Sequence, residues 1–138
     1  MHTTRTAILV VAVAMYTAAL TARQVAPADT ATVKQVMLTM TIPASDAIFS
    51  AAFDPPKDAK AWQALRTHAA TLVESGTLLM TSSLAKDNTT WMEMARGLVT
   101  EAQATVKATD AKNVDALAKA SDKVYTTCET CHDRYMDK

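Results

Sequence analysis

The stretch that decides the fold is residues 54–84, DPPKDAKAWQALRTHAATLVESGTLLMTSSL. Asp54-Pro55-Pro56 predicts the end of one helix and the start of another, because a proline at the first helical position lacks only an N–H that would have no partner there. Apolar and small residues then recur along one helical stripe: Trp62, Leu65, Ala69, Leu72, Gly76, Leu79 and Ser83. The stretch therefore predicts an amphipathic helix over roughly Lys57–Leu84.

Three further helices flank this one. The first begins after a cap at Asp29 or Thr30 and carries its apolar residues at helical spacing, with Pro43 predicted to kink or break it near Thr39–Ile42. The third follows the turn at Lys86-Asp87-Asn88 and runs to about Thr109. Its start, Thr90-Trp91-Met92-Glu93, fits a capping box.

Asn113 predicts the cap of the fourth helix, which reaches about Tyr135. The chain has 138 residues with only two Gly and four Pro, which suits one helical domain and leaves few turn residues for an all-β fold. Four amphipathic segments joined by short turns predict an all-α, antiparallel up-down-up-down four-helix bundle. Reflection about the second turn places Gly76 level with Gly97, which predicts a close approach of the two backbones or room for a flat ligand.

The N-terminal residues 1–22 are expected to be a signal peptide rather than part of the fold. Arg5 is the only charged residue before an apolar run at Ala7–Leu20, and small residues suited to cleavage follow. A retained membrane anchor is the alternative, and only then would the protein contact a membrane. Residues 23–29 are interpreted as a linker, and residues 30–138 as the bundle domain.

The charges are balanced, with 14 Lys and Arg against 14 Asp and Glu. Such a chain has no basic footprint for nucleic acid, so no nucleic-acid partner is expected.

The predicted last helix carries Cys128-Glu129-Thr130-Cys131-His132, which includes the only two cysteines. Residues three and four apart share a helix face, so both thiols can add to the vinyl groups at one edge of a porphyrin, and His132 can coordinate the iron. The motif predicts one covalently attached haem c. A chance match, a disulfide and part of a zinc site stay open as alternatives, although zinc would need a fourth ligand.

A helical bundle with this motif on its last helix resembles the cytochrome c′ family and its low-spin relatives. The resemblance covers residues 30–137 and rests mostly on Cys128–Tyr135, with Lys34-Gln35 similar to a basic-Gln pair that the family often carries. It implies a haem inside the bundle at the end that holds the C-terminus, with the first helix over its distal face. Tyr135 is expected to pack on the proximal side of the haem. Relatives are often dimers through their first two helices, which implies a homodimer surface with contributions from Phe49, Phe53 and Trp62.

The sixth iron ligand is expected to be Met37. Counting levels along the bundle places Met37 about 12 Å deeper than His132, an offset that the imidazole, the iron and an opposing side chain can span, whereas His68 falls about 21 Å away. His68 is therefore interpreted as a partly buried, hydrogen-bonded residue. Aligning Lys34-Gln35 with the family places Leu38 at the distal position instead, and this alternative would leave a five-coordinate iron.

The leading hypothesis is a periplasmic one-electron carrier that meets a redox partner protein. The alternative is a five-coordinate haem protein that binds NO or CO, and a third is a bundle without haem that serves as an interaction module. An enzyme is not expected, because the sequence has no recognisable catalytic acid–base pair, nucleophile or phosphate loop.

Overall fold

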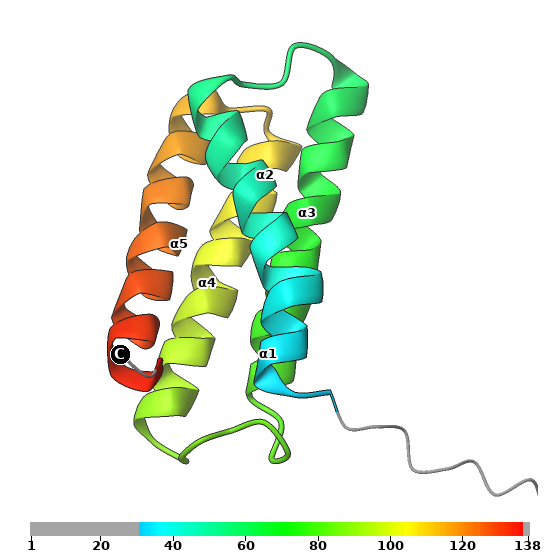
Figure 1. Ribbon diagram of the computed structural model, residues 1–138. Coiled ribbons are helices and arrows are strands. Elements are labelled where there is room, and N and C mark those ends of the chain that lie inside the picture. Colours follow the sequence, from blue (N-terminus) through cyan, green and yellow to red (C-terminus); the bar gives the residue numbers. More distant parts are fainter. Residues whose placement is uncertain (1–30, 137–138) are drawn as a thin grey trace, which may run out of the picture.

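The computed structural model describes residues 31–136, and these form the predicted bundle. Helix α1 (Val33–Val36), the π-helical turn η1 (Met37–Thr41) and α2 (Ile42–Phe53) make one continuous helical rod, followed by α3 (Ala59–Leu79), α4 (Thr90–Asp110) and α5 (Val114–Tyr135). The start of α1, the α3–α4 connection and the end of α5 lie at one end of the bundle (Figure 1). The all-α, antiparallel up-down-up-down arrangement is confirmed. The predicted signal peptide (1–22) and linker (23–29) lie outside the described residues.

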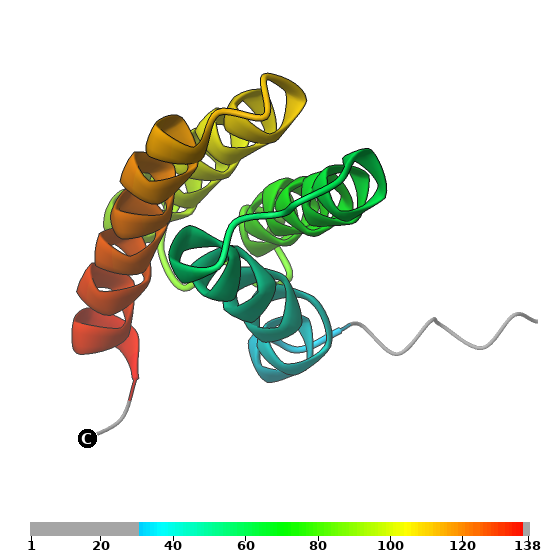
Figure 2. The same ribbon diagram turned by 90° about the horizontal axis from the view of Figure 1, so that it is seen from above.

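The helices pack in a closed order. Helix α3 packs against α4, α4 against α5, and α2 lies against both α3 and α5, as the view from above shows (Figure 2). The predicted apolar stripe of α3 faces the core, where Ile48 of α2 and Leu117 and Val124 of α5 are completely buried. Burying an aliphatic side chain contributes about 1.5–3 kcal/mol, so this shared core holds the bundle together.

The predicted disturbance at Pro43 is confirmed as a π-helical turn. Proline has no N–H to donate to the carbonyl of Thr39, and its ring collides with that carbonyl in a regular α-helix. The chain widens by one residue just before it, and the N–H of Ile42 donates to the carbonyl of Met37. The rod therefore continues past Pro43 with its first part rotated relative to its second part.

Helix α3 is shorter than predicted. Asp58 caps it by accepting a hydrogen bond from the N–H of Ala61 at 2.8 Å, and it ends at Leu79 rather than Leu84. The Thr81 hydroxyl donates to the carbonyl of Leu78, a local bond that competes with helix continuation. Leu84 then turns back into the core. The α3–α4 connection is consequently a ten-residue loop at the C-terminal end of the bundle.

The predicted capping box at Thr90 is wrong. Thr89 occupies the N-cap position and its side chain does not cap the helix. Asp87 takes over this role, since its Oδ1 accepts hydrogen bonds from the N–H groups of Thr89 and Trp91, both at 3.0 Å. The predicted cap of α5 is confirmed, because Oδ1 of Asn113 accepts from the N–H of Ala116 at 2.9 Å.

The two glycines face different neighbours. A Cβ at Gly76 would lie 2.8 Å from Cγ2 of Val99, so α3 and α4 do approach closely there. A Cβ at Gly97 would meet Cγ2 of Thr127 on α5 at 3.7 Å. The predicted close approach of two backbones is confirmed for Gly76 alone. The two glycines do not face one another, because Gly76 faces α4 whereas Gly97 faces α5.

The rod Val33–Phe53 also passes a length and composition test for a membrane span, with 21 residues and a mean hydropathy of 1.4. In the structure it is the first helix of the bundle and packs on α3 and α5. Of the residues expected on a dimer surface, Phe53 is 92% exposed, whereas Trp62 is buried in the core and Phe49 packs edge-on against Tyr125.

Candidate functional site

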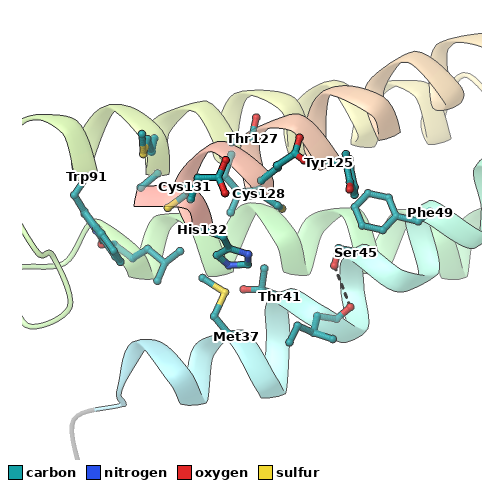
Figure 3. A pocket seen from close by; sticks show the side chains of 17 residues that line it. Met37, Thr41, Ser45, Phe49, Trp91, Tyr125, Thr127, Cys128, Cys131 and His132 are labelled. Atoms are coloured by element: carbon teal, nitrogen blue, oxygen red, sulfur yellow. Dashed lines mark hydrogen bonds between the residues drawn. The ribbon is translucent and has the colours of Figure 1, made fainter. Parts of the chain in front are cut away.

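A largely apolar pocket opens between the first rod and helices α4 and α5, toward the C-terminal end of the bundle (Figure 3). Its volume is about 360 Å³, within the range of small-molecule and cofactor sites. The pocket has two facing walls, one on the first rod and one on α5, and it is lined by Met37, Thr41, Ile42, Ser45, Phe49, Leu79, Trp91, Met94, Ala95, Leu98, Tyr125, Thr127, Cys128, Glu129, Cys131, His132 and Asp133.

One wall is the last part of α5, where the helical spacing brings Cys128, Cys131 and His132 to the same pocket. Burial raises the pKa of the Cys128 thiol, with a smaller contribution from the nearby Cys131, and burial also raises the pKa of Cys131. Both thiols are free and half-buried, and the imidazole of His132 projects across the pocket (Figure 3). The structure brings these three residues to one pocket, and their role in holding a haem stays a prediction.

The other wall is the first rod, and Met37 lies on it. Its side chain points toward His132 across the pocket (Figure 3). Leu38, the alternative distal residue, is 56% exposed and lies outside the lining. Of three other methionines in the bundle, Met94 lines the pocket from α4, whereas Met80 and Met92 pack against the core elsewhere.

Trp91 forms the floor at the C-terminal end of the bundle. It is buried, lines the pocket, and donates from Nε1 to the carbonyl of Leu79 at 2.6 Å. Its ring meets Tyr135 edge-on, with the centroids 5.0 Å apart and the planes at 76°. Trp91 thus connects the end of α3, the start of α4 and the end of α5. We therefore expect it to hold this end of the pocket in shape.

Tyr135 lies beside the pocket rather than in its lining. Its hydroxyl donates a short hydrogen bond to Oδ2 of Asp87, in the α3–α4 loop. This bond, followed by that from the N–H of Trp91, lowers the pKa of Asp87 to about 2, and the same carboxylate raises the pKa of Tyr135. The contact of Tyr135 with the proximal side of a haem stays a prediction. Sequence reasoning missed Asp87, whose only signal was an acidic residue three positions before the predicted helix.

His68 and Gln35, both singled out from the sequence, lie away from the pocket. His68 is exposed on α3, so the expectation of a partly buried histidine is wrong. Gln35 instead caps the start of α1. Its Oε1 accepts a hydrogen bond from the N–H of Thr32 at 2.7 Å, and the hydroxyl of Thr32 accepts one from the N–H of Gln35. Arg134 lies over the ring of Tyr135, 5.7 Å from the centroid.

The chemistry offered by the pocket is that of two thiols, one imidazole and one thioether against an apolar background. Within residues 31–136, no group of three or more His, Cys, Asp or Glu side chains is placed to bind a metal ion through these side chains alone. A structural zinc site takes four protein ligands placed around one point, an arrangement that residues 31–136 do not show.

Comparison with known proteins adds no family. No family model matches the chain, and neither a curated protein nor a solved structure is significantly similar to it. The described residues therefore define a four-helix, all-α protein with two cysteines on its C-terminal helix.

Proposed function

We propose that the chain is an exported c-type cytochrome of the four-helix-bundle class, similar to the low-spin relatives of cytochrome c′, and that it carries single electrons in the periplasm. Cys128 and Cys131 would hold one haem by thioether bonds, and His132 and Met37 would be its axial ligands. The observation that carries the proposal is the placement of Met37 on the wall opposite Cys128, Cys131 and His132, across one apolar pocket.

The residues present fit such a group. The two thiols are one helical turn apart on the same wall, and they are half-buried rather than hidden. The pocket is lined mainly by apolar side chains such as Ile42, Leu79 and Leu98, as a porphyrin plane requires. Glu129 and Asp133 also reach the lining but are exposed, so water solvates their charges and they do not oppose an apolar occupant.

When bound, the haem supplies an iron that can gain and lose one electron. The protein's part is to fix the ligands and limit solvent. A thioether from Met raises the reduction potential relative to a second imidazole and keeps the iron low-spin. Trp91, held by Leu79 and Tyr135, and the surrounding apolar side chains exclude water, which also sets the potential. A rigid pocket allows the oxidation state to change with little rearrangement of these side chains.

The covalent attachment is tested by producing the full chain with the cytochrome c maturation machinery in a bacterial periplasm. We expect a haem-stained band on a denaturing gel and a mass increase of one haem. Cys128→Ser with Cys131→Ser should abolish both. Colourless protein with two free thiols would refute the proposal, and would leave an interaction module as the remaining class.

The sixth ligand is tested by absorption spectra of the oxidised and reduced protein, with and without carbon monoxide. We expect a low-spin spectrum that changes little on brief exposure to carbon monoxide, and Met37→Ala should become high-spin and bind the gas rapidly. Met94→Ala, in the same pocket, and Met80→Ala, outside it, are matched controls that should stay low-spin. A wild-type protein that binds carbon monoxide at once would favour the gas-binding function instead.

A further inference from the structure

The first rod presents its residues to the pocket through a π-helical turn, Met37–Thr41. After the turn, Ile42, Ser45 and Phe49 line the pocket at spacings of three and four, as one face of an α-helix requires, and Thr41 lines it beside Ile42. Continuing that repeat toward the N-terminus leads to Leu38, four residues before Ile42. The residue that actually lines the pocket is Met37, five residues before Ile42, and Leu38 is turned to the outside.

The extra residue is taken up by the π-helical turn Met37–Thr41. The N–H of Ile42 donates to the carbonyl of Met37, five positions back, where an α-helix would use Leu38. The buried residues Val36 and Thr41, of which Thr41 also lines the pocket, are likewise five apart. One inserted residue rotates everything before it by about 100°, the angle per residue of a helix with 3.6 residues per turn.

Pro43 is the residue in the rod that accounts for this turn. It is exposed, lies outside the pocket lining, and contributes no side-chain contact to the site. Its ring and its missing N–H disfavour a regular helix at the carbonyl of Thr39, and the wider turn relieves the collision.

We propose that Pro43 is a positioning residue that, by imposing the π-helical turn, selects Met37 instead of Leu38 to face His132. The consequence for iron rests on the proposed function: a thioether can be an axial ligand and a leucine side chain cannot. A proline whose own side chain does not line the pocket then decides between a six-coordinate carrier and a five-coordinate, gas-accessible iron.

The test uses the mature haem protein and three variants. Pro43→Ala keeps every pocket residue and should restore a regular helix, with Leu38 at the pocket and Met37 turned into the core. It should be mainly high-spin and bind carbon monoxide. The exchange Met37→Leu with Leu38→Met keeps Pro43 and should also be high-spin. Combining Pro43→Ala with the exchange should return the low-spin spectrum, because the methionine then occupies the position that a regular helix directs at His132.

The rescue separates positioning from simple damage, since a misfolded variant would not recover on further substitution. A crystal structure of Pro43→Ala supplies a second readout that does not depend on the iron, with the N–H of Ile42 expected on the carbonyl of Leu38. The inference is overturned if Pro43→Ala stays low-spin or keeps the π-helical turn, or if the combined variant stays high-spin. Absence of attached haem from the wild type would instead defeat the proposed function, and the gel stain distinguishes the two failures.

Discussion

The two glycines allow a matched test of how closely α3 and α4 pack. In both positions Gly→Ala should add about 0.8–1.0 kcal/mol of helix stability, because alanine loses less backbone entropy than glycine in a helix interior. At Gly97 the new Cβ meets Thr127 at 3.7 Å, an ordinary contact. Gly97→Ala should therefore stabilise the protein by up to about 1 kcal/mol, or raise its melting temperature by about 4–8 °C.

At Gly76 the same change has a different result. The new Cβ would lie 2.8 Å from Cγ2 of Val99 and 3.4 Å from the Val99 backbone nitrogen, so the helices must separate. Overpacking of this kind costs about 1–3 kcal/mol, which cancels or exceeds the gain in helix stability. Gly76→Ala should be about 1–3 kcal/mol less stable than Gly97→Ala.

Urea unfolding followed by far-ultraviolet circular dichroism measures both variants against the wild type. The comparison between the two alanines removes the shared helix-propensity term and leaves the packing term. Equal stabilisation by the two substitutions would show that α3 and α4 are not in close contact at Gly76.

Three further outcomes follow from the described contacts. The pKa of Asp87 is lowered in the folded protein, so its contribution to stability is complete above about pH 4 and is lost as the pH falls toward 2. Unfolding free energies measured across this pH range should show the loss, and Asp87→Asn should make them depend less on pH. Leu72→Ala removes a side chain with 0% exposure and should cost about 2–5 kcal/mol in urea unfolding, with an exposed-site change such as Leu78→Ala costing far less. Trp91→Phe leaves the buried carbonyl of Leu79 without its 2.6 Å donor, which should cost about 1–3 kcal/mol in the same assay and, on the proposed function, shift the haem spectrum; an unchanged protein would show that Trp91 does not hold the pocket.

Much of the fold could be predicted from local patterns. The stripe from Trp62 to Leu79 and the cap at Asn113 depend on interactions within a few residues, and the structure confirms them. The Cys128, Cys131 and His132 cluster is equally local, since one turn of one helix brings these residues together. The prediction for the start of α4 failed because a nearby side chain, supported by a residue distant in the sequence, capped the helix instead. The capping box at Thr90 was wrong because Asp87, held in turn by Tyr135 from the other end of the chain, takes the free N–H groups.

The amino-acid sequence by itself determined the helices, their order and the motif on the last one, because helix periodicity, caps and motif spacing act over a turn or two. Only the tertiary structure decided which residue faces His132. Counting levels along the bundle placed the residue opposite His132 on the first helix. Whether Met37 or Leu38 faces the pocket depends on the rotation of that helix about its axis, and one added residue changes this rotation by about 100°. Pro43 predicts a disturbance of the helix, but a kink, a break and a π-helical turn would each rotate Met37 differently. The packing of Val36 and Thr41 in the folded protein accompanies the π-helical turn, so the direction of the rotation is seen only in the tertiary structure.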